Sequence, residues 1–261
     1  MILLRDRFLY LNSLQAWWPV CPEGVYPLLS EAPVVTVMQC TEEVAGPLTA
    51  FAFRRKPFCT LFLDLSRPES ELWHGIQSRT RHYIKQASKT DYRVLVNQDT
   101  EKAFRLTNEF IRRSRFRPPL SMEEWSQIKE HGDVFLLEHG GGVLAATVVL
   151  VDHPTRARML LGATADRSDA RYHQLVGPFN KFLTWHICTY YKAKGIRWYD
   201  FGGVDLDPTS PLYSISQFKL AFGGRPVSEY ILRLSARPVL RSALRGIFSA
   251  RLKLRSAVAG H

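Results

Sequence analysis

Hydrophobic positions follow two periodicities along most of this chain of 261 residues. Continuous or alternating apolar runs are typical of strands, and apolar residues three or four positions apart are typical of amphipathic helices. From about residue 90 onward, these patterns predict a strand, two helices, three antiparallel strands, a helix, a strand, a helix and a last strand. The predicted strands are 92–96, 134–137, 143–151, 157–162, 196–201 and 227–234, and the predicted helices begin at Thr100, Ser121, Pro178 and Pro211.

Capping and turn residues mark the ends of several of these elements. Ser121 and Glu124 form a capping box, in which the serine oxygen accepts a hydrogen bond from a backbone amide of the first helical turn. Gly132 is predicted to end that helix. Residues 140–142 are three glycines and predict a hairpin turn, and Pro178 suits the first turn of a helix.

The chain before residue 90 is less regular. Two strand-like runs, TAFAF and FCTLFLDL, flank a polar turn at residues 54–57, so a hairpin is predicted over residues 46–65. A helix is predicted to follow, with Ser66 and Glu69 as its capping box. One face of this helix is apolar, and the other carries the cations Arg79, Arg81, Lys85 and Lys89.

Composition narrows the class of protein. The chain is 46% hydrophobic, which is enough to build one large core. No apolar run is long enough to span a bilayer. Arg5, Asp6 and Arg7 follow a very short apolar start, whereas a secretory signal has its charges first and a longer apolar region after them. A cytoplasmic location is therefore predicted.

The formal net charge is +11 and is unevenly distributed. Glu229 is the last acidic residue, and it is followed by Arg233, Arg237, Arg241, Arg245, Arg251, Lys253 and Arg255. This basic tail favours an anionic partner, such as RNA, an acidic carrier protein, a nucleotide-linked substrate or an anionic membrane. An amphipathic pattern in the tail also suits peripheral contact with a membrane surface, and it is formed by Leu240, Leu244, Ile247 and Phe248. The alternative is a solvated tail that keeps the protein soluble.

The sequence lacks the motifs of metal and covalent catalysis. The four cysteines show no metal-ligand spacing and no H-E-x-x-H pattern occurs, so we expect no metal and no cofactor. Neither a G-x-S-x-G motif nor a Cys/His pair of recognised spacing is present. If the chain transfers an acyl group, we expect the acceptor to attack the donor directly.

Two segments late in the chain carry a family resemblance. Residues 199–204 read YDFGGV, and residues 217–224 read QFKLAFGG. Together they resemble the Y-D-F-G-G and F-K-x-x-F-G-G signature of FemAB-like proteins. The family's R-x-x-I-x-x-A-x-K helix is similar to the segment that contains Arg81, Ile84, Ala87 and Lys89. FemAB-like proteins are GNAT-fold aminoacyltransferases that attach amino acids from aminoacyl-tRNA to peptidoglycan precursors.

The resemblance implies a fold class and a division of the chain. The fold class is α/β, with a GNAT-like (acyl-CoA N-acyltransferase) fold in which a mixed central sheet is flanked by helices and its central strands splay apart around the donor. We expect a reduced N-terminal region with a hairpin (1–65), a GNAT/FemAB-like transferase domain (66–235) and a basic C-terminal tail (236–261). Well-known members carry two GNAT-like domains and this chain is expected to carry one, which leaves the acceptor open.

The segment before the helix at Pro178 bears on the donor. In GNAT proteins that use acetyl-CoA, a Q/R-x-x-G-x-G/A loop binds the pyrophosphate through its backbone amides. The corresponding residues 167–177 lack that glycine pair. This difference argues against ordinary CoA use and favours aminoacyl-tRNA or an acyl carrier protein as the donor.

Three residues are the catalytic candidates. The resemblance places Lys219 at the acyl end of the donor, where its ammonium would stabilise the oxyanion or the departing ribose oxygen; a helix-dipole role is the alternative. Asp200 either accepts a proton from the amine or orients the loop at Gly202 and Gly203. His173 is the histidine that we would test as a base, because its segment borders the donor cleft of GNAT proteins.

Substrate-binding candidates surround these residues. Phe218 is expected to stack on the terminal adenosine of the donor, or to be an ordinary core residue. Gly202 and Gly203 allow the backbone to approach a ligand closely. Tyr213 either donates a hydrogen bond to a leaving group or packs. The other candidates are Tyr199, which precedes Asp200, and the cations Arg81 and Lys85, which would attract a polyanionic donor.

The sequence thus predicts an acyltransferase that forms an amide bond at an amine, with aminoacyl-tRNA as donor. The alternative is an N-acyltransferase that uses acyl-CoA or acyl carrier protein on a sugar or amino-acid amine. A non-catalytic RNA- or membrane-associated module is a third hypothesis, and the intact signature argues against it. The acceptor is expected to be a small-molecule amine or an amine of a cell-envelope precursor.

Overall fold

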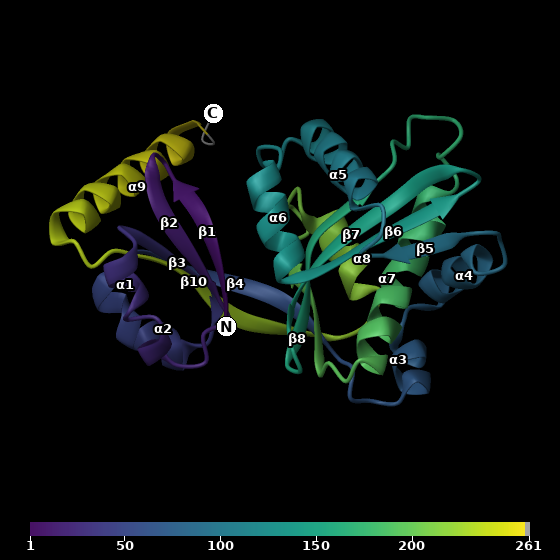
Figure 1. Cartoon of the computed structure of the whole chain (residues 1–261), viewed down its shortest axis with the longest axis horizontal. Coiled ribbons are helices and arrows are strands. Elements are labelled where there is room, and N and C mark those ends of the chain that lie inside the picture. The colour runs from purple at the N-terminus through teal and green to yellow at the C-terminus, as the bar shows by residue number, and fades with distance from the viewer. Residues whose placement is uncertain (259–261) are drawn as a thin grey trace. The chain divides into compact units, whose positions relative to one another are not determined.

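The computed structural model describes residues 1–258, with side chains up to residue 250. The described chain forms two compact units. The first unit combines Met1–Cys59 with the chain from Ser228 onward, and the second is Thr60–Val227. Strands β4 (Ala52–Asp64) and β10 (Arg225–Leu234) contribute residues to both units (Figure 1).

The second unit contains the element order that the sequence predicts from residue 92 onward. Its strands follow the order β4-β9-β8-β7-β6-β5, in which β8 and β9 are parallel and the other neighbouring pairs are antiparallel. The strands are β5 (Arg93–Val96), β6 (Gly132–His139), β7 (Gly142–Asp152), β8 (Arg156–Thr164) and β9 (Trp198–Gly203), and the helices are α3 (Glu69–Gly75), α4 (Ser78–Ala87), α5 (Thr100–Ser114), α6 (Met122–Glu130), α7 (Val176–Ala193) and α8 (Tyr213–Leu220). The predicted mixed sheet of an α/β fold is therefore confirmed.

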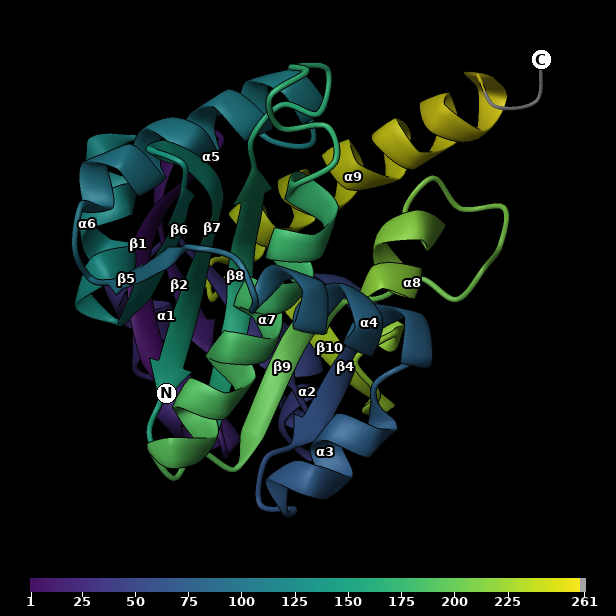
Figure 2. The same cartoon turned by 90° about the vertical axis from the view of Figure 1, so that its right-hand side faces the viewer.

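The core of the second unit surrounds the middle of this sheet. Residues 144–150 of β7 are all buried, so neither face of that strand meets solvent. Helices α5 and α7 both pack against β6, β7 and β8, and we infer that one helix covers each face. Figure 2 shows α7 beside α4, and these two helices pack together. Aromatic rings fill the space under α7, where Tyr191 and Phe201 lie on either side of Tyr199.

The predicted cap of α6 is present. The Oγ of Ser121 accepts a hydrogen bond from the amide of Glu124 at 3.1 Å, which satisfies one of the free donors of the first turn. The predicted ends are less accurate. Helix α6 stops at Glu130, and Gly132 is the first residue of β6 rather than the end of the helix. Helix α7 begins two residues before Pro178.

The predicted hairpin over residues 46–65 is wrong. Residues 52–64 form one continuous strand, β4, and the polar run 54–57 is extended within it. The side chains of this run have partners without a turn: the guanidinium of Arg54 lies 4.9 Å from the ring centroid of Phe248, and that of Arg55 lies 4.2 Å from the ring centroid of Tyr230. The run TAFAF begins in a short 3₁₀ turn, Thr49–Phe51.

The predicted helix after Ser66 is also wrong in its start and continuity. It is two helices, α3 and α4, because Ile76 and Gln77 are extended between them. The Oγ of Ser66 donates to the carboxylate of Asp64, so the predicted capping box with Glu69 does not form.

The strands of the first unit follow the order β1-β2-β3-β10-β4. Its further elements are β1 (Ile2–Phe8), β2 (Leu11–Trp17), β3 (Val34–Cys40), α1 (Leu28–Glu31), α2 (Glu42–Leu48) and α9 (Pro238–Val258). Helices α1 and α2 pack on the cluster that includes Val35 and Leu232. None of the strands before residue 49 was predicted from the sequence.

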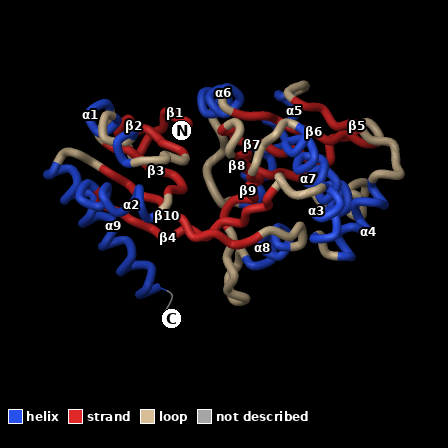
Figure 3. Tube along the Cα trace, turned by 90° about the horizontal axis from the view of Figure 1, so that it is seen from below, coloured by secondary structure: helices blue, strands red, loops and turns tan. Residues whose placement is uncertain are grey.

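The basic tail forms α9, the long helix that runs to the C-terminal label in Figure 3. Its apolar residues pack inside the first unit. Leu244 is buried with Val34 and Phe53, and Leu240 and Phe248 pack against the same cluster. The amphipathic pattern is thus explained by packing within the protein. No helix among residues 1–258 is long and apolar enough to cross a membrane.

Candidate functional site

Strands β8 and β9 part in the middle of the second unit. Their parallel ladder contains three residue pairs and ends where Arg158 faces Asp200. Beyond that point, β8 continues to Thr164 beside β7, and β9 continues to Gly203 beside β4. Ligands of open α/β sheets bind at the carboxyl ends of strands that diverge in this way. The residues around this divergence are therefore the candidate site.

Asp200 is held by four neighbours at this point. Its side chain is fully buried. One carboxylate oxygen accepts hydrogen bonds from the amide of Gly202, at 2.7 Å, and from the hydroxyl of Thr60. The other oxygen lies 3.7 Å from the Nε of Arg158 and 3.8 Å from an Nη of Arg156. A carboxylate with this many donors is better suited to fixing the turn at Gly202 than to accepting a proton.

The glycines of the two signature segments meet local requirements of the backbone. Gly202 has φ +76°, and a Cβ there would lie 3.3 Å from both the Arg158 guanidinium and the carbonyl oxygen of Met159. Gly224 has φ +92°, and a Cβ there would lie 2.6 Å from the carbonyl oxygen of Phe62. Glycine alone adopts these angles at little cost and leaves room for these neighbours.

Lys219 reaches from the last turn of α8 to the end of β9. Its Nζ donates a hydrogen bond to the carbonyl oxygen of Gly203 at 2.6 Å. Burial, and secondly the nearby Arg158, lower the pKa of Lys219 to about 8, and Asp200 opposes this shift. Near neutral pH the side chain is therefore mostly an ammonium that loses its proton readily. Such a group can donate a hydrogen bond to an oxyanion or to a departing oxygen.

The aromatic candidates occupy different environments. The ring of Phe218 is partly buried, and it lies 5.5 Å from Phe222 and 5.7 Å from the ammonium of Lys181. Tyr199 is fully buried, and its hydroxyl has no hydrogen-bond partner among the described residues. Burial raises the pKa of Tyr199. The prediction that Tyr199 contacts substrate is therefore corrected: this residue belongs to the core beneath α7.

Arg81 and Lys85 are not arranged as predicted. The guanidinium of Arg81 donates to the carbonyl oxygens of Trp73, His74 and Ile76, at and just after the end of α3. Arg81 thus joins α3 to α4 and is not free to attract a substrate. Lys85 is exposed, with its Nζ 5.9 Å from the ring of Trp73.

The remaining candidates, His173 and Tyr213, lie before α7 and at the start of α8. His173 is exposed in the segment before α7, where its Nδ1 is 3.1 Å from the carbonyl oxygen of Arg167. Among the described residues, no direct hydrogen bond or ion pair joins His173 to Lys219 or Asp200. Tyr213 is the first residue of α8 and is partly buried.

Three residues of the site were missed by the sequence analysis: Thr60, Arg156 and Arg158. The two arginines carry a readable signal, since they stand two positions apart in an apolar strand and therefore share one face of it. Two cations on one face of a buried strand predict an acidic partner. Thr60 carries no such signal, because threonine is common in strands of every kind.

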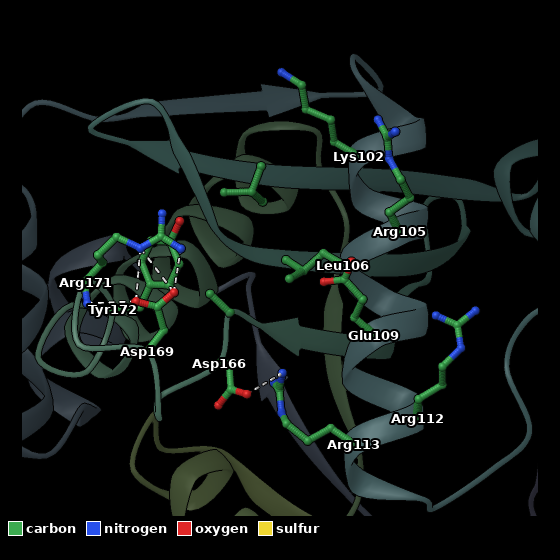
Figure 4. A pocket seen from close by; sticks show the side chains of 12 residues that line it. Lys102, Arg105, Leu106, Glu109, Arg112, Arg113, Asp166, Asp169, Arg171 and Tyr172 are labelled. Atoms are coloured by element: carbon green, nitrogen blue, oxygen red, sulfur yellow. Dashed lines mark hydrogen bonds and ion pairs between the residues drawn. The ribbon is translucent and has the colours of Figure 1, made fainter.

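A hollow of about 850 Å³ lies between α5 and the residues that follow β8 (Figure 4). Ion pairs join Arg113 to Asp166 at 3.7 Å and Arg171 to Asp169 at 2.6 Å across or beside it. The hollow is lined by charged side chains of both signs and by three apolar residues: Lys102, Arg105, Leu106, Glu109, Arg112, Arg113, Val143, Ala165, Asp166, Asp169, Arg171 and Tyr172. Such a lining suits a small molecule that is itself charged.

The part of the chain that the structure describes holds no group of three or more histidine, cysteine or acidic side chains that could bind a metal ion.

Comparison with known proteins gives one matching family and several solved structures with a similar fold. The family described as acetyltransferase (GNAT) domain matches residues 76–211. FemX has a similar structure, with a TM-score of 0.66 and 14% identity over 93% of this chain and 86% of that chain. The C-terminal domain of a putative lysylphosphatidylglycerol synthetase from Agrobacterium fabrum has a TM-score of 0.58 and 15% identity, covering 93% and 82% of the two chains. L-PGS from Bacillus licheniformis has a TM-score of 0.58 and 12% identity, covering 93% and 84%. No curated protein matches the sequence.

Proposed function

Since this chain belongs to the acetyltransferase (GNAT) domain family and is a transferase, we propose that it moves an aminoacyl group from aminoacyl-tRNA to an amine. The observation that carries this proposal is the position of Lys219. Its ammonium lies at the end of β9, just past the point where β8 and β9 part, within the F-K-x-x-F-G-G segment that resembles FemAB-like proteins.

The proposed reaction needs no covalent enzyme intermediate. The nitrogen of the neutral acceptor amine attacks the carbonyl carbon of the aminoacyl ester, and a C–N bond forms. The resulting oxyanion collapses, and the bond from that carbon to the ribose oxygen breaks. The nitrogen loses one proton and the ribose oxygen gains one. Lys219 assists as a hydrogen-bond donor to the oxyanion or to the ribose oxygen, where negative charge develops.

Asp200 and Arg158 support this step without contacting the substrate. Asp200 fixes the amide of Gly202 and thereby the position of the Gly203 carbonyl to which Lys219 donates. Arg158 lies beside the same carboxylate and lowers the pKa of Lys219. Both residues therefore position Lys219 and set its acidity, and we class them as positioning residues.

Two observations favour aminoacyl-tRNA over CoA as the donor. Residues 167–177 lack the glycine pair with which CoA-dependent GNAT proteins bind pyrophosphate. The folds of FemX and of a protein named as a putative lysylphosphatidylglycerol synthetase align with 93% of this chain each. The second name denotes a product in which a lysyl group is attached to a lipid.

The hollow beside α5 is the proposed place of the acceptor. Glu109 lines it and has no ion-pair partner among the described residues, so its carboxylate is available to an ammonium group. Arg105 and Arg112 line the same hollow and are also unpaired among the described residues. An amine that carries an acidic group, such as an amino acid or an acidic cell-envelope precursor, fits both signs of charge.

The alternative is an N-acyltransferase that uses acyl-CoA or acyl carrier protein on a sugar or amino-acid amine. Family membership alone favours it, since the matching family is described as acetyltransferases. A direct comparison of donors separates the two functions. Purified protein is offered aminoacyl-tRNA, acetyl-CoA and acyl carrier protein, each with a labelled acyl group and a mixture of amines.

Mass spectrometry of the products identifies the transferred group. Aminoacylated amine from the tRNA reaction alone supports the proposal, provided that Lys219→Met abolishes it and Lys129→Met, which changes an exposed lysine of α6, does not. Acylated amine from acetyl-CoA or the carrier protein alone, with no tRNA-dependent product, contradicts the proposal in favour of the alternative.

A further inference from the structure

Lys181 on α7 is a partly buried cation without a counter-ion. Its Nζ lies 5.0 Å from the ring centroid of Tyr83 on α4 and 5.7 Å from that of Phe218 on α8. Among the described residues, Lys181 makes no hydrogen bond and no ion pair with an acidic group. A half-buried ammonium with two aromatic faces and no anion has lost water without gaining a full replacement.

Two further cations act on the same position. Burial, and secondly Arg167, lower the pKa of Lys181, and Arg79 lowers it further; Tyr83 opposes this shift. Arg79 is exposed, with its guanidinium 3.4 Å from the hydroxyl of Tyr83 and 5.8 Å from the ring centroid. No carboxylate acts on the pKa of Lys181. Three cations therefore approach one place without an acid, and an anion bound there would relieve their mutual repulsion.

This cluster lies next to the transfer site. Phe218, which faces Lys181, directly precedes Lys219 in α8. The cluster is built from α4, α7 and α8, which Figure 2 shows on the side of the second unit that faces the viewer. An anion held by Lys181 and Arg79 would thus lie near the ring of Phe218, the residue that precedes Lys219.

The aromatic rings add a second property. The rings of Tyr83 and Phe218 both lie near the Lys181 ammonium, at 5.0 Å and 5.7 Å from it. Phosphate-bearing ligands with a base or another flat group combine ionic contacts with stacking on such rings. A simple carboxylate would use the cations and leave the rings unused.

We propose that Arg79 and Lys181, with the rings of Tyr83 and Phe218, form a phosphate-binding subsite for the acyl donor. The inference rests on the proposed function in that it assigns this place to the donor and not to the acceptor. Side chains of α4 and α7 bind the phosphate here. The phosphate belongs either to the 3′-terminal nucleotides of tRNA or to the phosphopantetheine arm of CoA or a carrier protein.

Binding of small probes tests the subsite without any need for turnover. The probes are a CCA trinucleotide with its phosphodiester groups, adenosine as a phosphate-free control, and coenzyme A, each titrated calorimetrically into the full-length protein. Lys181→Met and Arg79→Gln remove one cation each, and Lys181→Arg keeps the charge. Lys129→Met on α6 is the matched control, because Lys129 is exposed and has no ionic partner among the described residues.

We expect the Kd of a phosphorylated probe to rise about tenfold in Lys181→Met and in Arg79→Gln, as for the loss of one charge-assisted contact. Lys181→Arg and Lys129→Met should bind like the wild type. Because Arg79 is exposed, Arg79→Gln tests the idea even if Lys181→Met lowers the melting temperature.

The result also separates this inference from the proposed function. Binding of the CCA probe that depends on its phosphate and on Lys181 supports both. Binding of coenzyme A alone with the same dependence supports the subsite and contradicts tRNA as donor. Equal affinities of the wild type, Lys181→Met and Arg79→Gln overturn the subsite even if aminoacyl transfer is observed, as does a wild-type protein that binds none of the phosphorylated probes.

Discussion

The ammonium of Lys219 donates a hydrogen bond to the carbonyl oxygen of Gly203, 2.6 Å away. This contact connects the last turn of α8 to the end of β9, and so it connects the two halves of the signature that the sequence shows 13 residues apart, at residues 199–204 and 217–224. The two segments are therefore in direct contact at the place where the sheet opens.

Replacement of Lys219 by methionine should abolish turnover and leave the fold intact. Methionine keeps the apolar packing of the side chain and removes its charge. Loss of one oxyanion contact lowers the rate on the order of 100-fold or more. Single-turnover rates with the donor found by the comparison above measure the effect, with Lys129→Met as control. Activity like that of the wild type, at an unchanged melting temperature, would return Lys219 to a structural role at the end of α8.

The pH dependence of transfer should report the protonation of Lys219. Burial and Arg158 lower the pKa of Lys219 to about 8. If the ammonium is the active form, the rate falls as the pH rises through about 8, because the donor proton is lost. The acceptor amine must be neutral, so its deprotonation produces the opposite, rising limb at lower pH. In Lys219→Arg the guanidinium stays protonated, and any remaining activity should lack the falling limb. A rate that keeps rising above pH 8 in the wild type would instead identify neutral Lys219 as a base.

Replacement of Asp200 by asparagine should destabilise the protein. Asparagine can still accept the hydrogen bond from the Gly202 amide, but it leaves the guanidiniums of Arg156 and Arg158 without their acidic neighbour. Removal of one member of a buried ion pair costs about 3 kcal/mol of unfolding free energy. Urea denaturation measures this, and the matched control is Asp207→Asn, which changes an exposed carboxylate in the segment before α8. Equal stabilities of the two variants would mean that Asp200 does not balance the arginines.

Replacement of Leu244 by alanine tests the packing of α9 in the first unit. Leu244 is 2% exposed and lies in the cluster with Val34 and Phe53. A buried Leu→Ala change costs about 3 kcal/mol. Ile247 on the same helix is 43% exposed, and Ile247→Ala should cost less than about 1 kcal/mol. If both variants unfold at the same urea concentration, the apolar face of α9 is not packed, and the membrane-surface interpretation of the tail gains support.

The sequence predicted the second unit far better than the first. From β5 to β10, each element has its own periodicity and its ends carry caps or turns, such as Ser121 with Glu124. In β4, a polar run that looks like a turn stays extended, because Arg55 and Arg54 contact aromatic rings from distant parts of the chain. Local patterns cannot show such contacts.

The candidate site also contains residues that the sequence predicted and residues that it did not. Lys219 and Asp200 were predicted as site residues because the motif surrounds them. Lys181 and Tyr83 were not, since their relation exists only once α4 and α7 pack together. Arg81 shows the opposite error: its charge suggested a substrate, and the structure gives it three carbonyl oxygens at the end of α3. Charge in a sequence indicates an anionic neighbour without saying whether that neighbour belongs to the same chain.

Lys85 and Lys89 provide the last prediction, which concerns RNA. Both are exposed on or just after α4, and neither has an ion-pair partner among the described residues. If they contact tRNA phosphates, the affinity should fall steeply with salt, and each lost contact should reduce the slope of log K against log[salt] by about 0.9. The double variant Lys85→Gln/Lys89→Gln should therefore flatten the slope by nearly two, measured by filter binding of labelled tRNA between low and physiological salt. Lys129→Gln should leave the slope unchanged.

Deletion of α9 is unsuitable as a test of the tail, because it would expose the apolar cluster around Leu244. Arg237→Gln changes an exposed tail cation instead. A slope that is the same in the double variant and the wild type would exclude α4 from the RNA contact, and no salt dependence at all would argue against tRNA as the donor.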